Sequence, residues 1–281
     1  TLRALADLLF LPFLALGLAF PLMRSRAWRN LIFLVFLTVL FFLNAAFHFG
    51  WIEARVALDA SVLAVMMVVS LVGSRVIPSF TVAGLRLRGI LVYQTDHHKI
   101  DTAALCLLAV LAFLTAADEL GSFFSGAVAV TASFLHLWRM RSWHTLKTGS
   151  DPLLWILHAG HLWLVAGLCA LGFYGLGFLQ SPSPGLHMLT VGAIGSLTIG
   201  MMARVALGHT GRPLVVRPAI AFSFVLMQIS AVLRVLAFAM PAGEYFLWAA
   251  AAAVFWSLAF ALYFIFYTPI LLGPRPDGLD P

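Results

Sequence analysis

The chain has 281 residues, of which 62% are hydrophobic and only 10% are charged, and its mean hydropathy is +1.01. Soluble domains contain about 25% charged residues, so this composition excludes an ordinary soluble protein and predicts one that lies in a membrane. The net charge of +6 does not indicate a nucleic-acid partner, because the basic residues fall in short connections between apolar runs. The expected partner is membrane lipid.

Nine apolar stretches follow one another along the chain. A helix needs about 20 apolar residues to cross the hydrocarbon core of a bilayer, and each stretch is close to that length. We therefore predict an all-α, polytopic transmembrane helix bundle that forms a single domain over residues 1–281. The predicted spans are residues 2–23, 30–50, 57–77, 102–118, 121–141, 152–178, 187–208, 218–240 and 245–268.

The connections between the spans predict the orientation. Most of the 17 Lys and Arg residues lie in alternate connections on one side of the predicted bundle. That side includes the longest connection, residues 78–101, which we expect to be a solvated loop. The positive-inside rule places this side in the cytoplasm. The prediction is a multi-pass protein whose C-terminus is cytoplasmic.

Two histidines are predicted near the outer surface. Histidines inside a spanning helix are costly unless they are paired or bind a ligand, so they mark candidate sites. His48 lies near the end of the second span and His187 begins the seventh, and they could bind one haem or one metal ion from facing helices. Arg234 lies in the eighth span, where its charge needs an anion such as Asp59, Glu244 or a haem propionate. The alternative is that the histidines only form hydrogen bonds at the interface.

A second group of candidates lies near the cytoplasmic side. His136 and His158 lie at matching depth on adjacent spans, at ~8–9 Å from the surface for a helical rise of ~1.5 Å per residue, as a shared metal or a hydrogen-bonded pair requires. His161 lies one turn beyond His158, and taken alone it favours a structural role. His209 ends the seventh span, where the alternative is a polar, helix-terminating turn. The basic side chains here that could pair with haem propionates are Arg75, Arg139 and Arg204.

Five stretches of the sequence carry a specific family resemblance. They are residues 75–81 (RVIPSFT), 151–158 (DPLLWILH), 187–195 (HMLTVGAIG), 208–214 (GHTGRPL) and 267–275 (YTPILLGPR). In these stretches the chain resembles the NnrS family. The family pattern also has N-terminal helices with a Trp-His-x-His-Glu-Met motif, and that motif is not found here. We therefore expect this chain to lack the family's N-terminal helices.

The resemblance implies a protein of the bacterial inner membrane that binds haem b and copper and acts in nitric oxide metabolism or resistance. The bound molecule would be nitric oxide or another diatomic. If the protein is an enzyme, we expect an oxidoreductase that draws electrons from quinol or a redox protein. It could act alone, as an oligomer or as a subunit of a complex. Two alternatives stay open, a transporter of a metal or metabolite and a non-catalytic subunit of a respiratory complex.

Overall fold

The computed structural model describes residues 2–26, 28–95, 97–276 and 278. Within these residues the chain forms helices and no strand, which confirms the predicted all-α fold class. Short 3₁₀ turns, η1 (Trp28–Asn30), η2 (Thr145–Lys147) and η4 (Ala237–Ala239), lie between or at the ends of the long helices. The long helices are α1 (Leu2–Arg24), α2 (Ile32–Phe49), α3 (Ala54–Leu87), α4 (His98–Ala116), α5 (Phe123–Met140), α6 (Pro152–Gly175), α9 (Pro218–Leu236) and α10 (Tyr245–Leu272), together with one rod made of α7 (Ser183–His187), the π-helix η3 (Met188–Ile194) and α8 (Gly195–His209).

Eight helical segments of the described chain are long and apolar enough to cross a membrane. The protein is therefore a multi-pass membrane protein. The ninth long helix, α5, is 18 residues long, the same length as α2. It carries His136 and Arg139 near its C-terminal end, and these polar residues reduce its hydropathy.

α3 is longer than the apolar stretch that predicted it. The expected loop at residues 78–101 is wrong in its bounds, because α3 continues through Pro78 to Leu87 and α4 begins before residue 101. A proline removes one backbone N–H, and contacts with neighbouring helices can stabilise a spanning helix across it. Beyond the proline, Gly84 is buried, and a Cβ added there would meet Leu154 of α6 at 2.9 Å. Packing against α6 therefore carries the helix past the proline.

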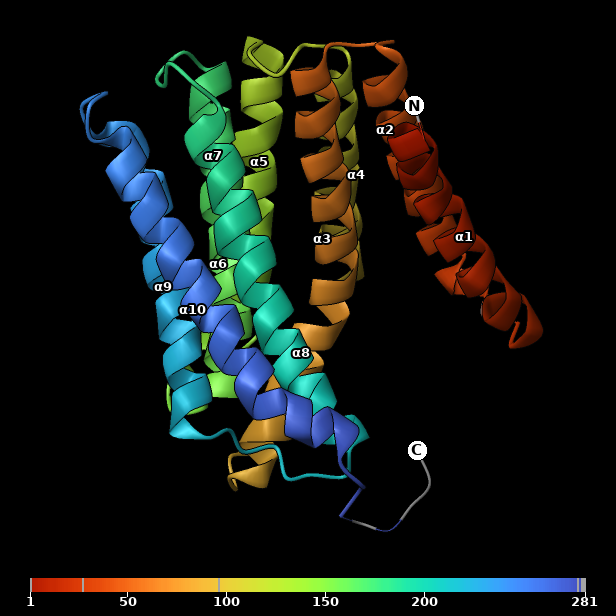
Figure 1. The fold of residues 1–281 in the computed structure, drawn as a ribbon, viewed down its shortest axis with the longest axis vertical. Coiled ribbons are helices and arrows are strands. Elements are labelled where there is room, and N and C mark those ends of the chain that lie inside the picture. Colours follow the sequence, from red (N-terminus) through yellow and green to blue (C-terminus); the bar gives the residue numbers. More distant parts are fainter. Residues whose placement is uncertain (1, 27, 96, 277, 279–281) are drawn as a thin grey trace.

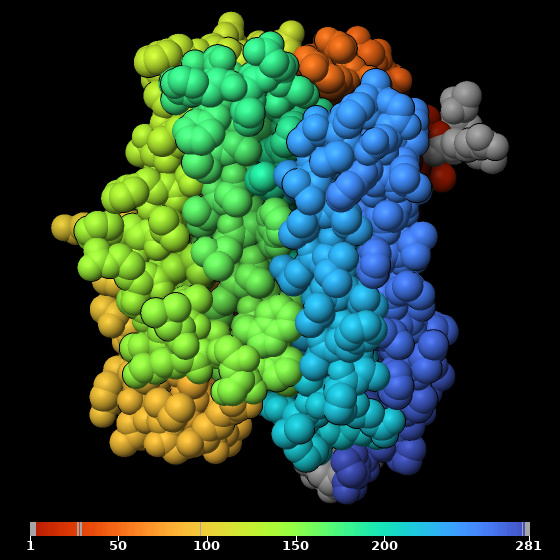
Figure 2. Space-filling view, turned by 90° about the vertical axis from the view of Figure 1, so that its left-hand side faces the viewer, coloured from red at the N-terminus to blue at the C-terminus, as the bar shows by residue number. Residues whose placement is uncertain are grey.

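The helices form a bundle around α6 (Figure 1). α6 packs against α3, α5, α8 and η3. In its most apolar stretch 67% of the residues are buried, whereas none is buried in the corresponding stretch of α1. α1 packs on α2 at one edge of the bundle, and α9 pairs with α10 at the opposite edge. Figure 2 shows α5, α6 and α9 side by side on one face. The central position of α6 takes His158 and His161 into the interior.

α5 and α6 approach each other closely because glycines lie where they cross. A Cβ built on Gly126 of α5 would lie 2.7 Å from the backbone nitrogen of Leu176, and one on Gly175 of α6 would lie 2.6 Å from the backbone nitrogen of Gly126. Small residues at such positions allow helix backbones in a membrane protein to come together. The crossing holds α5 against α6 and so brings the histidines of the two helices within reach of each other.

We predict that Gly126→Ala destabilises the bundle, because the added methyl group meets backbone atoms that cannot move aside. Overpacking of this kind costs about 1–3 kcal/mol, and it should lower the temperature of thermal unfolding in detergent. Gly17→Ala on α1 is the control, since nothing lies within 4 Å of the carbon it adds. An unfolding temperature for Gly126→Ala equal to that of the unmodified protein would contradict the close crossing.

Candidate functional site

A pair of buried histidines lies between α5 and α6. The rings of His136 and His161 have their centres 5.4 Å apart and tilt by 40° to each other. Both side chains are fully buried, at 0% exposure. All four of their ring nitrogens lack a hydrogen-bond partner among the described residues. Buried polar groups are almost always hydrogen-bonded, so four unpartnered nitrogens at one place call for a ligand.

An indole ring and a guanidinium group border this histidine pair. Trp143 lies in the connection after α5, and its ring centre is 4.6 Å from that of His161. Arg139, one turn beyond His136 on α5, holds its guanidinium 5.5 Å from the centre of the Trp143 ring. These contacts place a positive charge close to the pair and shield the pair from water.

Arg139 is held in place from two other helices. Its guanidinium donates to the backbone carbonyl of Ser70 on α3 at 3.3 Å and to the Ser70 hydroxyl at 3.2 Å. It also donates to the Asp101 carboxylate on α4 at 3.3 Å. The Arg139 side chain is 1% exposed and that of Asp101 is 31% exposed. The carboxylate therefore supplies the counter-charge that a buried guanidinium requires.

His158 has partners for both of its ring nitrogens. Its Nε2 lies 2.8 Å from the Thr81 hydroxyl of α3, and its Nδ1 lies 3.0 Å from the Thr145 hydroxyl of η2. The Thr81 hydroxyl also donates to the carbonyl of Ile77, so it accepts from an Nε2–H of the ring. This bonding joins α3 and η2 to α6. The structure thus pairs His136 with His161, one turn further along α6 than the residue that depth alone suggested.

The histidine pair supplies side chains that could act as metal ligands. Imidazole nitrogen suits copper, zinc and iron. No group of three or more His, Cys, Asp or Glu side chains converges as metal ligands in the described part of the chain. The pair therefore offers two protein ligands. It suits a metal ion that needs few ligands from the protein.

A different cluster lies at the opposite end of the bundle, around His187. Its Nδ1 lies 2.8 Å from the carbonyl of Ser183, and its Nε2 lies 2.8 Å from a guanidinium nitrogen of Arg234. Arg234 also donates to the Tyr245 hydroxyl at 3.0 Å. No carboxylate among the described residues forms an ion pair with Arg234. The π-helix η3 begins immediately after His187, and π-helical turns occur frequently at functional sites.

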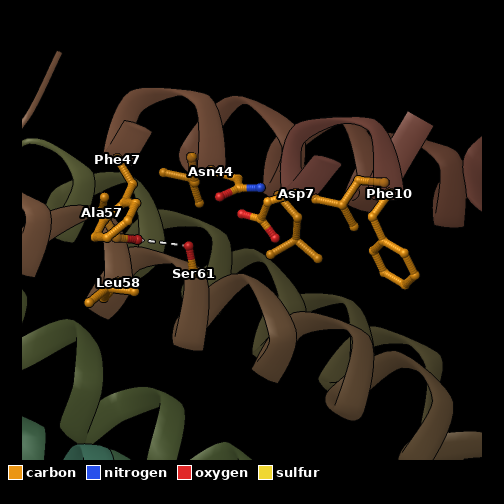
Figure 3. Close-up of a pocket in the computed structure, with 10 residues that line it drawn as sticks. Asp7, Phe10, Asn44, Phe47, Ala57, Leu58 and Ser61 are labelled. Atoms are coloured by element: carbon orange, nitrogen blue, oxygen red, sulfur yellow. Dashed lines mark hydrogen bonds between the residues drawn. The ribbon is translucent and has the colours of Figure 1, made fainter. Parts of the chain in front are cut away.

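The structure does not bring His48 to His187. His48 lies on α2, which packs against α1 and α3, whereas His187 ends α7, which packs against α6, η3 and α9. The Nε2 of His48 instead lies 2.7 Å from the Asp7 carboxylate of α1. Asp7 also lines a cavity of about 390 Å³ between α1, α2 and α3. Figure 3 shows Asp7, Asn44 and Ser61 as polar side chains in this otherwise apolar cavity.

The remaining predicted site residues have separate surroundings. His209 is exposed at the end of α8, where its backbone carbonyl accepts from Arg275 at 3.1 Å. Arg204 holds its guanidinium 4.2 Å from the centre of the Phe80 ring. Arg75 is exposed on α3 and lines a small polar pocket that also includes Asp101. Within the described part of the chain, none of these three side chains forms a hydrogen bond, ion pair or ring contact with His136 or His161.

Sequence reasoning did not single out three residues that shape the histidine environment. Thr81 closes the RVIPSFT stretch, so the motif itself carried a signal for it. Trp143 and Thr145 lie in a basic connection, where an aromatic residue ordinarily indicates an anchor at the membrane surface. Only the folded chain shows that this connection turns inward, with Trp143 just 4% exposed.

The fold and this site define a multi-pass helical membrane protein with two free imidazoles in its interior. The family model described as NnrS protein matches residues 1–275, so the chain belongs to the NnrS family. This confirms the resemblance found in the five stretches. At the level of the family it is a membrane protein related to nitric oxide. No match was found among curated proteins or among solved structures.

We predict that Asp101→Ala destabilises the bundle, because it leaves the Arg139 charge buried without a counter-charge. Removal of one partner from a buried pair costs about 3–5 kcal/mol, and the partial exposure of Asp101 favours the lower end. Denaturant titration in detergent measures the loss. The double variant Asp101→Ala/Arg139→Met should recover part of it.

Glu119→Ala, in the connection after α4, is the control, since Glu119 is exposed and forms no ion pair among the described residues, and surface substitutions of this kind change the stability by about 0.5 kcal/mol or less. The stability losses of Asp101→Ala and Arg139→Met are also measured separately. If the double variant loses as much stability as these two losses added together, Arg139 and Asp101 are not coupled.

Proposed function

We propose that this protein binds copper and haem and acts on nitric oxide, with copper held by His136 and His161. The observation that carries the proposal is the set of four unpartnered imidazole nitrogens in a fully buried pair. Leaving one buried polar group without a partner costs about 1–3 kcal/mol. A bound ion would satisfy one nitrogen of each ring and remove part of that cost.

The charges around the pair favour copper in its singly charged state. Arg139 places a positive charge one turn from His136, and like charges repel more strongly in a low-dielectric interior than in water. An added charge of one is therefore less costly there than an added charge of two. Cu(I) also accepts few ligands, and the pair supplies two. When bound, Cu(I) supplies an electron-rich centre to which a diatomic molecule such as nitric oxide can bind.

The surrounding residues would keep such a centre dry and fixed. Trp143 covers His161, and the bonds of Arg139 to Ser70 and Asp101 tie α5 to α3 and α4. His158 does not need to bind metal in this scheme. Its two threonine bonds fix the rotation of α6 one turn from His161, which makes it a positioning residue.

The haem belongs elsewhere in this proposal. A porphyrin is far wider than an imidazole and does not fit between the packed rings of His136 and His161. His187 and Arg234 offer an imidazole and a cation without a carboxylate partner, the types of residue that hold a haem iron and a propionate. Haem binding there requires the 2.8 Å contact between His187 and Arg234 to open.

We also propose the orientation that the basic connections indicate, in a bacterial inner membrane with the C-terminus in the cytoplasm. The copper pair would then lie in the cytoplasmic half and the His187 cluster in the outer half, since His161 lies in the first half of α6, whereas α7 follows the C-terminal end of α6 (Figure 1). Electrons for a redox reaction would come from quinol or a redox protein, and the enzyme class would be an oxidoreductase.

We predict that His136→Ala and His161→Ala each lower copper affinity by more than about 100-fold, since loss of even an indirect partner of a metal ligand costs 10–100-fold. Metal analysis of the purified protein after titration with Cu(I) measures the effect. His209→Ala, an exposed histidine at the end of α8, is the control and should keep the copper. Copper bound at full stoichiometry by both the His136 and His161 variants would overturn the assignment.

We predict that the purified protein shows b-type bands in a reduced-minus-oxidised visible spectrum, and that His187→Ala abolishes them. Arg234→Leu should weaken haem retention, because a propionate loses its cation. His97→Ala, at the residue that precedes α4, is the control and should leave the bands unchanged. Bands that persist in His187→Ala at wild-type intensity would move the haem to another histidine.

A further inference from the structure

An apolar groove lies between α3 and α8, beside the histidine pair. Its volume is about 250 Å³. α3 contributes valines, among them Val69, Val72 and Val76, and α8 contributes Leu197 and Met201. These five side chains are partly exposed, so the groove opens on the surface that faces lipid. α6, which carries His161, packs against both α3 and α8 and lies behind the groove.

Gly73 is the point where this groove comes nearest to the histidines. It lines the groove on α3 and is itself buried. A Cβ built on Gly73 would lie 3.8 Å from Nδ1 of His161 and 3.5 Å from the side chain of Ile77. That ring nitrogen is fully buried and has no hydrogen-bond partner among the described residues. The missing side chain of Gly73 thus leaves a gap between the groove and an imidazole nitrogen that is free to bind.

We infer that the α3–α8 groove is a lateral entrance by which a small uncharged diatomic molecule, such as nitric oxide, passes from the bilayer to His161. This inference rests on the proposed function, because it gives the molecule a destination at the histidine pair. An uncharged diatomic dissolves in hydrocarbon and loses no hydrogen bonds at a wall of valine, leucine and methionine. Ions and larger polar solutes lose their hydration there.

The entrance also explains why a glycine stands inside a long helix. Glycine in a helix interior costs about 0.5–1 kcal/mol relative to alanine, and the positions that an alanine methyl would take here are at ordinary contact distances. Alanine would therefore fit and stabilise α3. What the methyl group would take away is the gap beside Nδ1 of His161.

The test compares Gly73→Ala and Gly73→Leu with the unmodified copper-loaded protein in lipid nanodiscs. Stopped-flow mixing with nitric oxide measures the association rate constant. Gly73→Leu should lower it by about tenfold or more, as a small added barrier does, and Gly73→Ala should lower it less while the protein unfolds at a higher temperature. Val110→Leu, a lipid-facing change on α4, is the matched control and should leave the rate unchanged.

A second measurement does not depend on copper. Xenon binds apolar cavities, so the metal-free protein under xenon pressure should hold xenon beside Gly73, and Gly73→Leu should not. If the protein fails to bind added copper but still holds xenon in the groove, the proposed copper function is refuted and the proposed entrance is retained. A groove without xenon, or an association rate that Gly73→Leu leaves unchanged while copper stays bound, would overturn the entrance.

Discussion

The close contact between α5 and α6 is the interaction on which the candidate site depends. The glycines at the crossing allow the two backbones to approach as they do, and His136 and His161 lie side by side further along the same helix pair. Helix association in a membrane is driven by packing and by interhelical hydrogen bonds, because lipid tails are as apolar as leucine. Small residues are therefore the means by which this chain brings two polar residues together in its interior.

The buried histidines illustrate how a membrane interior separates structural from reactive polar groups. His158 has a hydroxyl group for each ring nitrogen, and these bonds hold three elements together. His161, one turn further along α6, and His136, on the adjacent α5, have none among the described residues. A buried polar group without a partner lowers stability. This contrast between neighbouring buried histidines supports the proposed role of the free pair in binding.

Arg139, which is buried, and Arg234, which is partly buried, are stabilised in different ways. Arg139 has a carboxylate, Asp101, and so forms a complete pair next to the histidines. Arg234 has an imidazole and a phenol as neighbours, and it forms no ion pair within the described part of the chain. The Arg139 guanidinium already has its counter-charge and needs no further anion. The Arg234 guanidinium has no such counter-charge, which supports the proposal that its cluster holds a propionate-bearing cofactor.

The sequence by itself determined the class of protein, the approximate number and order of the helices, and the family. These follow from composition, the length of apolar runs and short motifs, all of which are local. It also identified both histidines of the buried pair, although it matched His136 with His158. The extension of α3 through Pro78 escaped prediction because it depends on contacts with α6.

Only the tertiary structure decided which side chains meet. Depth along a span can be read from helical rise, but the rotation of each helix and the identity of its neighbours cannot. One turn along α6 therefore separated the predicted partner of His136 from the observed one, His161. His48 and His187 were predicted at the same depth, yet they lie on helices with different neighbours. Lateral packing, which is set by small residues and side-chain shape across the whole bundle, chose between arrangements that hydropathy alone makes equivalent.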